Sequence, residues 1–465
     1  MFRAIFTNSS GILFSRITGF FRDLIMASTL GVNIFSDIFF IAFKLPNLFR
    51  RIFGEGAFSQ AFIPSFSRVK NRFIFATSTF TQLLFVIVLL TIFVNLFPAT
   101  VTKMIAIGYS WELIERAKDF VAINFTYLIL IFTVTFLSAL LHYREHFMTT
   151  AYSTSLLNLS LIVAMLLSAD MSKESMVYYL SYGVVIGGAL QVITHLLALY
   201  YIKTLRPLFL GFGKWRKWSR SRDDRGVFYQ KFIFGIWGNS TAQISVFIDT
   251  WLATFLSVGS VSYLYYGNRV FQLPLALFAI ATTTAIFPKI SKLIKSGDEV
   301  KAKALLKNGF WFLLYMLSIS TAIGIIFSEK IVWLLFERGE FTSSDTVITS
   351  SILALYLIGL ITYGVSKLLS LWLYANEQMR ESAKIASYSL LANVLFSMIL
   401  IAPMGVSGLA LSSTLSSFIL LIFTIRIFGV ENFKEIVVSK HILYLTLLLT
   451  ILIPVGLYIE TTLMF

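Results

Sequence analysis

The stretch "FKLPNLFRRIFGEGAFSQAFIPSFSR", residues 43–68, reads in part as a membrane helix, yet charged residues interrupt it. Lys44, Arg50, Arg51 and Glu55 lie between its phenylalanines. A cation at the centre of a bilayer costs about 2.5–3.5 kcal/mol on insertion scales. Because such charges are tolerated only where they face water or an acid, the stretch predicts a polar interior within an apolar fold.

The whole chain has the composition of a polytopic helical membrane protein. Its 465 residues are 57% hydrophobic and 13% charged, and its mean hydropathy is +0.82. Windows of about twenty residues, such as 78–97 and 441–460, hold few or no charges, which suffices to cross roughly 30 Å of hydrocarbon as a helix. We predict thirteen spans, centred near residues 16, 46, 88, 130, 159, 188, 243, 275, 317, 360, 393, 416 and 450.

The charges between the spans predict the orientation. With the N-terminus in the cytoplasm, the inner connections include 67–72, 203–231 and 289–307, and the last two together hold 15 Lys and Arg residues. The opposite connections are mostly uncharged, as the positive-inside rule requires. The net charge of +15 is therefore topological, and a nucleic-acid partner is not expected. With no cysteine and four scattered histidines, neither disulfides nor a metal centre are expected.

An internal echo predicts two repeated halves. Phe-Lys-Leu-Pro at 43–46 matches Phe-Gln-Leu-Pro at 271–274, and "AFIPSFSR" at 61–68 resembles "AIFPKISK" at 285–292. Parallel repeats with a binding site between them are a transporter pattern. We expect an N-lobe of six helices at 1–205, a basic cytoplasmic linker at 206–228, a C-lobe of six helices at 229–430 and one additional C-terminal helix at 431–465, with a central cavity between the lobes.

The second half lacks the cations of residues 43–51, so the repeat alone does not explain them. At about 100° per residue, Asp37, Lys44, Arg51 and Glu55 share one face of the second helix. Arg50 points elsewhere, and Arg16 and Arg269 also lie well inside their spans. One interpretation is that these side chains snorkel to the interface or brace packing. The other is a solvated cavity whose guanidinium groups bind a diphosphate, next to apolar walls for a lipid tail.

A second candidate site contains an isolated carboxylate, Asp249, in "NSTAQISVFIDTWLATFL". This residue is compatible with countering Arg269, coordinating a cation or relaying protons. Asn393 and Thr414, on the eleventh and twelfth spans, are oxygen donors that suit the shell of a hard cation.

The segment "SRITGFFRDLIMASTLG" with "SDIFFIAFKLPNLFRRIFGEGAFSQAFIPSF", and later "SVSYLYYGNRVFQLPLALFAIATTTAIFPKISK", resembles the MurJ (MviN) family. These are bacterial lipid II flippases of the multidrug/oligosaccharidyl-lipid/polysaccharide (MOP) exporter superfamily. The resemblance implies alternating access in the inner membrane, a role in peptidoglycan synthesis, dependence on membrane potential and a possible Na⁺ site at Asp249. It implies substrate-binding arginines at Arg16, Arg22, Arg50 and Arg269, supported by Asp37, Lys44, Asn47, Glu55 and Ser262, beside which we also place Arg51.

The resemblance is incomplete at the C-terminus, where the family usually has two additional helices that form a groove for the lipid tail. Only 441–460 reads as a span here, so completion of the groove stays open. Three other functions are compatible with this sequence. They are a flippase for another polyprenyl-diphosphate glycan, a drug exporter, and a membrane glycosyltransferase, for which the short outer loops leave little room. Peptidoglycan synthesis enzymes are possible partners of the basic connection, beside lipid II and membrane lipids.

Overall fold

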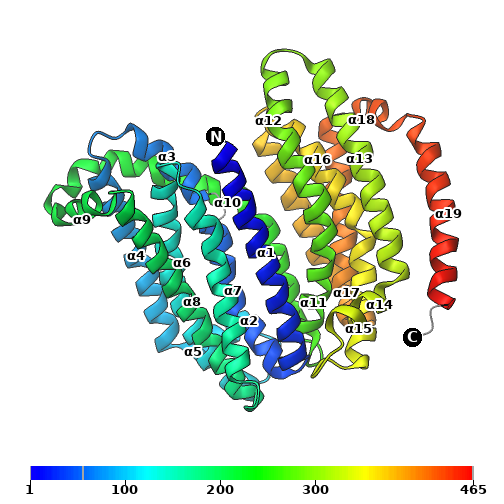
Figure 1. Ribbon diagram of the computed structural model, residues 1–465, viewed down its shortest axis with the longest axis horizontal. Helices are drawn as coiled ribbons and strands as arrows, with labels where there is room; N and C mark the ends of the chain where they lie inside the picture. The colour runs from blue at the N-terminus through cyan, green and yellow to red at the C-terminus, as the bar shows by residue number, and fades with distance from the viewer. Residues whose placement is uncertain (1, 55–56, 463–465) are drawn as a thin grey trace. The chain divides into compact units, whose positions relative to one another are not determined.

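The computed structural model describes residues 2–54 and 57–462, and the described chain is built from helices (Figure 1). No strand occurs among these residues. Within the helices, the side chains at positions 2–9, 51–54, 57, 219–223, 234–235 and 237–243 lie outside the described set. The prediction of an all-α polytopic fold is confirmed.

The chain divides into two compact units, and the first comprises Met1–Gln243 with the short segments Ser257–Gly259 and Arg338–Phe341. The predicted linker 206–228 therefore groups with this unit. The elements of unit 1 are α1 (Phe2–Leu30), α2 (Ile34–Gly54), α3 (Ala57–Arg68), α4 (Arg72–Leu96), α5 (Pro98–Ile105), α6 (Trp111–Tyr143), α7 (Met148–Leu167), α8 (Lys173–Tyr201), α9 (Leu205–Gly213), the 3₁₀ helix η1 (Trp215–Ser221) and the first part of α10 (Arg222–Ala253).

Unit 2 comprises Ile244–Leu256, Ser260–Glu337 and Thr342–Phe465, so the chain passes from one unit to the other within α10. The further elements of this unit are α11 (Ser260–Pro274), the π-helix η2 (Leu275–Ile280), α12 (Ala281–Lys295), α13 (Glu299–Ile326), α14 (Ser328–Phe336), α15 (Ser343–Ile358), α16 (Leu360–Ala375), α17 (Met379–Phe428), α18 (Val430–Val437) and α19 (His441–Thr462).

The order of elements in unit 1 returns in unit 2. A helix with an internal proline, α2 with Pro46 or α11 with Pro274, is followed by a helix with a second proline, α3 with Pro64 or α12 with Pro288. A long helix and then a short one follow in both units, α4 and α5 or α13 and α14. This order agrees with the predicted repeat, although α2 continues through Pro46 whereas Pro274 is followed by a π-helix, a feature often found where helices bend.

Each of the thirteen predicted span centres falls within a helix of the described chain. Nine helical segments of that described part are long and apolar enough to cross a membrane, when Ser260–Lys295 and Ser343–Ala375 are each taken as continuous. α1 and α2 are not among the nine, because charged residues lie along them. The two spans predicted around residues 393 and 416 lie together in α17.

α17 is a hairpin of two helices rather than one rod. Gly405 has φ 56° and ψ −131°, which interrupts the helix after Pro403. Asn393 donates a hydrogen bond to Ser413 (3.3 Å), and Ser389 donates to the carbonyl of Ser416 (2.9 Å). Because these partners stand at nearly equal distances along the chain on either side of residue 404, the two halves run antiparallel.

Unit 1 is organised around α6, which packs against α2, α3, α4, α5 and α8. An aromatic cluster joins three of its helices. The rings of Phe58 and Phe62 on α3 stack with their centroids 5.1 Å apart, and Phe62 meets Phe136 of α6 edge-on at 5.6 Å. Phe228 of α10 lies 5.7 Å from Phe58. Such pairs stabilise by about 0.5–1.5 kcal/mol beyond area burial, so they hold α3 against α6 and α10.

Two short connections from the second half of the sequence are bound within unit 1. The amide of Gly259 donates to the Asp37 carboxylate (2.7 Å), and the amide of Glu340 donates to the carbonyl of Ser28 (2.9 Å). Lys173 of α8 forms an ion pair with Glu340 (3.1 Å). These contacts attach the connections to the turn between α1 and α2.

The α17 hairpin supplies a test of close packing. A Cβ atom at Gly408 would lie 2.3 Å from the carbonyl oxygen of Leu400, which belongs to backbone and has little freedom to move. We expect Gly408→Ala to lower the free energy of unfolding by about 1–3 kcal/mol, measured by denaturation in detergent. Gly226→Ala is the matched control, since a Cβ there would meet nothing within 4 Å. Equal stability of the two variants would contradict the hairpin geometry.

Candidate functional site

Arg22 is locked into the contact between α1 and α7. Its Nε and Nη2 donate to one oxygen of Asp23 at 3.0 and 2.6 Å, and its Nη1 donates to Asn158 Oδ1 at 3.0 Å. Asn158 in turn donates to the carbonyl of Ser15 (3.1 Å) and to Thr18 (3.2 Å). With Arg22 only 7% exposed, this predicted substrate-binding residue braces helix packing through a buried ion pair.

Helical periodicity groups Asp23 with Arg16, two turns earlier, and sets Arg22 about 120° away. The structure instead pairs Asp23 with its neighbour Arg22, because the long guanidinium stem reaches around the helix to the adjacent carboxylate. Arg16 is exposed on α1. Of the two α1 arginines, Arg16 is therefore the more accessible to a ligand.

Arg50 of α2 is half-buried, and its Nε donates to Asn47 Oδ1 at 3.0 Å. The structure thus brings together two predicted site residues, one helical turn apart. This hydrogen bond orients the guanidinium group. Lys44 is half-buried on the same helix. The predicted contributions of Glu55 and of the Arg51 side chain lie outside the described residues.

Asp37 is 1% exposed at the beginning of α2 and accepts the hydrogen bond from the amide of Gly259. Tyr109, in the connection between α5 and α6, lies within the electrostatic range of the Asp37 carboxylate. Burial and the negative charge of Asp37 both raise the pKa of the Tyr109 hydroxyl above its ordinary value, so the phenol stays neutral. Through the hydrogen bond from Gly259, Asp37 therefore holds the connection 257–259 against α2.

In unit 2, Arg269 is half-buried on α11 and its Nη2 donates to the hydroxyl of Tyr265 at 2.8 Å. The guanidinium carbon also lies 4.8 Å from the centre of the Tyr265 ring, within the range of a cation–π interaction. Asn268, where we expect an acid in some relatives, accepts a hydrogen bond from Gln272. Ser262 is fully buried on the same helix.

Arg16, Arg22 and Arg50 belong to unit 1, whereas Arg269 belongs to unit 2. The convergence of these arginines on one central cavity therefore stays a prediction. Each unit nevertheless contributes a guanidinium that a hydrogen bond within its own helix orients. In unit 1, Arg50 donates to Asn47, and in unit 2, Arg269 donates to Tyr265.

A second polar site lies inside unit 2, around Asp249 of α10. Ser413 donates to Asp249 Oδ2 at 2.8 Å, Asn393 donates to Ser413 at 3.3 Å, and Ser245 donates to Asn393 Oδ1 at 3.2 Å. Asp249 is 6% exposed, Asn393 is fully buried and Ser413 is 7% exposed. The structure therefore joins the predicted residues Asp249 and Asn393 through a serine that the sequence analysis did not single out.

Thr414, the third predicted member, turns toward α15 and donates to the carbonyl of Leu355 at 2.6 Å. Its neighbour Ser413 takes the place beside the carboxylate, because adjacent residues of a helix point about 100° apart. Ser397 lies one turn after Asn393 on the same helix face and is fully buried, and its hydroxyl makes no hydrogen bond within the described part of the chain. Ser397 therefore adds an oxygen donor near this site.

The donors around Asp249 are all oxygens, and they include one carboxylate. The part of the chain that the structure describes contains no group of three or more His, Cys, Asp and Glu suited to a metal ion. A set of hydroxyl, amide and single carboxylate oxygens fits a hard cation of low charge, such as Na⁺, better than a transition metal.

Lys367 is a further ionisable residue within an apolar helix, and the sequence analysis did not single it out. Its side chain is exposed on α16, and it is the only charged residue between Asp345 and Glu377 in the sequence. Its isolation in such a run is the signal that was available. Lys367 lies about 12 Å along α16 from its last residue, Ala375, at 1.5 Å per residue. This distance fits a side chain that snorkels toward the helix end and also one that lines a polar site.

Charged residues inside apolar helices, in a chain of two successive helical units, are typical of a polytopic membrane transporter. The family model described as "Lipid II flippase MurJ" matches residues 26–464. The chain belongs to this MurJ family, and the resemblance drawn from its sequence is confirmed.

Named relatives and solved structures agree with this membership. A "Probable lipid II flippase MurJ" of Helicobacter pylori strain J99 is 45% identical over 421 residues, which cover 89% of this chain and 92% of the relative. One of Aquifex aeolicus is 34% identical over 430 residues, covering 91% and 82%. The structure of a lipid II flippase MurJ in an inward closed conformation matches with a TM-score of 0.78 at 25% identity, covering 98% of this chain and 97% of that one.

An inward-facing multidrug resistance MATE family transporter of the MOP superfamily has a TM-score of 0.68 at 12% identity, covering 92% of this chain and 94% of that one. This likeness shows the fold alone.

The buried pair on α1 supplies a stability test. Asp23→Asn leaves the Arg22 cation buried without its carboxylate, so we expect the free energy of unfolding to fall by about 3–5 kcal/mol. The control is Glu112→Gln in the exposed ion pair with Arg116, whose side chains are 75% and 51% exposed, where about 1 kcal/mol or less is expected. Equally small losses in denaturation experiments would show that the buried pair does not brace α1.

Proposed function

We propose that this chain moves lipid II, the lipid-linked peptidoglycan precursor of the relatives' names, from the inner to the outer leaflet of the bacterial cytoplasmic membrane. The observation that carries the proposal is that Arg50 donates to Asn47 within α2 and Arg269 donates to Tyr265 within α11, which orients both guanidinium groups. Guanidinium forks match phosphate oxygens two at a time and keep their charge when partly desolvated. A diphosphate headgroup is the ligand that this chemistry favours.

Alternating access follows from the same electrostatics. A cavity lined by cations is costly to close in hydrocarbon, and a bound diphosphate lowers that cost by cancelling charge. The lipid tail stays in the membrane while the headgroup crosses. Any net charge that moves is worth about 2.3 kcal/mol per elementary charge for each 100 mV, so membrane potential can bias the cycle.

The Asp249 site is the proposed binding site for a coupling cation. Asp249 would supply the negative charge, while Ser413 and Asn393, already joined to it by hydrogen bonds, would supply neutral oxygens. Such a site would stabilise the conformation of unit 2 that binds the cation, by a free energy that grows with the logarithm of the cation concentration. Na⁺ is the ion that its donor set favours.

Orientation belongs to the same proposal. Excess Lys and Arg in the connections at 67–72, 203–231 and 289–307 favour a cytoplasmic N-terminus. Contact of the basic connection with peptidoglycan synthesis enzymes stays a prediction. A flippase for a different polyprenyl-diphosphate glycan remains the second candidate, since the same guanidinium chemistry serves any diphosphate.

Substituting the oriented arginines tests the substrate site. In cells that depend on this chain, we expect Arg50→Gln or Arg269→Gln to reduce lipid II in the outer leaflet at least tenfold, because charge-assisted hydrogen bonds are worth about 1.5–3 kcal/mol each. Arg116→Gln, which removes an exposed cation from α6, is the matched control and should leave transport within twofold of the original. Full transport by both cavity variants would remove the mechanism.

Carboxylate substitution tests the cation site separately. For the unchanged chain in detergent, we expect Na⁺ at about ten times its dissociation constant to raise the free energy of unfolding by about 1.4 kcal/mol over choline. Asp249→Asn should abolish that increment. Asp345→Asn is the control, since Asp345 is equally buried at 6% exposure but bonds to Tyr263 and Thr342, and it should retain the Na⁺ increment. An undiminished Na⁺ response of Asp249→Asn would exclude the proposed site.

A further inference from the structure

Unit 1 contains a cavity whose lining includes none of the predicted substrate arginines. Its volume is about 70 Å³, and it lies where α3 ends, α4 begins, α6 ends and α9 begins. Phe66, Phe73 and Leu140 form its apolar wall. A single water needs about 10–15 Å³ of such space, so the cavity has room for several water-sized groups, such as the oxygens of a phosphate.

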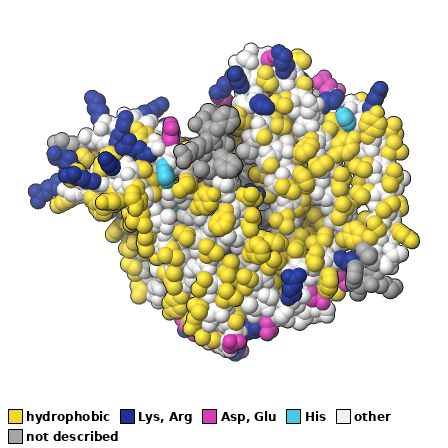
Figure 2. Space-filling view, viewed as in Figure 1, with side chains coloured by type: hydrophobic (Ala, Val, Ile, Leu, Met, Phe, Trp, Pro, Cys, Tyr) yellow, Lys and Arg dark blue, Asp and Glu magenta, His cyan; other side chains and the backbone are white. Residues whose placement is uncertain are grey.

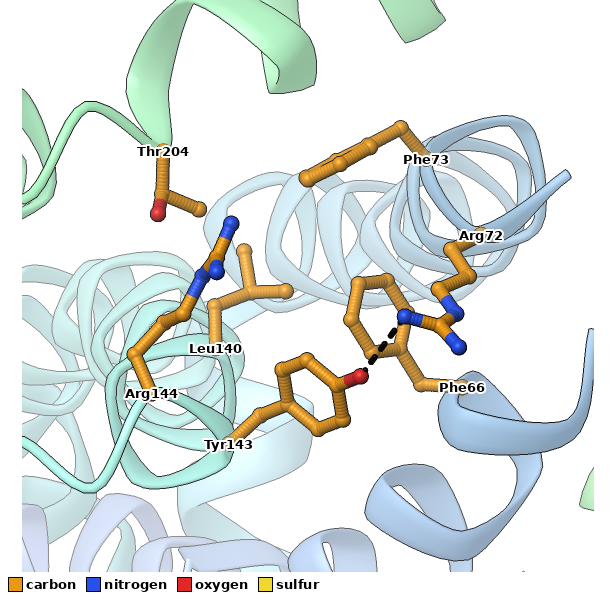
Figure 3. A pocket seen from close by; sticks show the side chains of 7 residues that line it. All are labelled: Phe66, Arg72, Phe73, Leu140, Tyr143, Arg144 and Thr204. Carbon is orange, nitrogen blue, oxygen red and sulfur yellow. Dashed lines mark hydrogen bonds between the residues drawn. The ribbon is translucent and has the colours of Figure 1, made fainter.

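Two guanidinium groups flank this cavity from different helices. Figure 3 shows Arg144 beside Thr204 on one side and Arg72 beside Tyr143 on the other. Arg72 donates to the Tyr143 hydroxyl at 2.8 Å and to the carbonyl of Ser67 at 3.2 Å, which holds its fork at the rim. Arg144 is exposed, and its guanidinium makes no hydrogen bond or ion pair within the described residues.

The remaining polar groups also suit an oxyanion. Tyr143 accepts from Arg72, so its own hydroxyl proton is directed elsewhere and can be donated to a ligand. Thr204 is 2% exposed and lines the cavity, and its hydroxyl donates to the carbonyl of Ile202 at 3.3 Å. Glu145 follows Arg144 and is exposed, but the cations of the adjoining connections outnumber it. They are Arg68, Lys70, Lys203 and Arg206, all exposed.

The cavity opens next to a segment built for the membrane surface. On α9, Leu208 and Gly211 are buried, and a Cβ at Gly211 would lie 2.6 Å from the carbonyl oxygen of Phe73 in the cavity wall. The opposite face exposes Phe209 (62%) and Leu210 (56%). Figure 2 shows Lys and Arg side chains gathered at this end of unit 1 above apolar surface. Apolar residues beside basic ones are typical of segments that lie in the headgroup region.

We propose that this cavity binds the phosphate of an anionic phospholipid from the cytoplasmic leaflet. The two guanidinium groups and Tyr143 receive the phosphate oxygens, while Phe209 and Leu210 of α9 line the path of the acyl chains. The assignment to that leaflet rests on the proposed orientation, in which the ends of α3, α6 and α8 face the cytoplasm. The adjacent exposed apolar residues favour a lipid phosphate over free phosphate, which has no tail to bury.

The test uses the purified full-length chain in neutral detergent, titrated with dioctanoyl phosphatidylglycerol and followed by native mass spectrometry. We expect one tightly bound lipid, with about tenfold weaker binding of dioctanoyl phosphatidylcholine. Arg144→Gln should weaken phosphatidylglycerol binding about tenfold, as the loss of a charge-assisted pair predicts. Because the guanidinium of Arg144 makes no hydrogen bond or ion pair within the described chain, this variant is expected to fold, which its melting temperature verifies.

Arg68→Gln is the matched control, since it removes an exposed cation from the same end of α3 outside the cavity. It should leave phosphatidylglycerol binding within twofold. Equal losses in Arg144→Gln and Arg68→Gln, or equal binding of the two lipids, would overturn the proposal in favour of diffuse surface attraction. Displacement of the lipid by millimolar inorganic phosphate would overturn it in favour of a free-anion site.

Discussion

Charge inside hydrocarbon is the constraint on which this structure depends. An ionised side chain in a membrane helix needs an opposite charge, a polar partner or water. Arg22 meets this need with the carboxylate of Asp23 and the amide of Asn158, which makes it a brace between α1 and α7. Arg50 donates to Asn47, and Arg269 donates to Tyr265. Each of these three arginines is thus oriented by a polar side chain of the described chain.

Unit 2 applies the constraint to an acid. Asp249 is buried, and hydroxyl and amide groups from both arms of the α17 hairpin stabilise its charge. The hairpin brings Asn393 and Ser413 together because Gly405 takes a backbone conformation with positive φ that most residues avoid. The turn at Gly405 therefore packs the two arms of α17 together and also assembles the polar site around Asp249.

Much of the fold could be predicted from hydropathy, since all thirteen span centres fall in helices. The matched prolines predicted the repeat, and the family resemblance named both Asn47 and Arg50, which a hydrogen bond joins. Two features were beyond reach. The pairing of Arg22 with its neighbour Asp23 depends on a side-chain conformation that a helical wheel ignores. The choice of Ser413 over Thr414 depends on how α17 is rotated against α10 and α15, which tertiary packing decides.

The chain has no cysteine, so one introduced thiol can be probed alone in the complete protein. Arg16→Cys, Arg50→Cys and Arg269→Cys would each be exposed to a charged, membrane-impermeant thiol reagent in inside-out membrane vesicles. If these positions line one wet chamber that binds lipid II, all three should react far faster than Leu89→Cys, at a 50% exposed apolar position of α4, and added lipid II should slow all three. Labelling as slow as at Leu89, or labelling that lipid II leaves unchanged, would contradict the chamber.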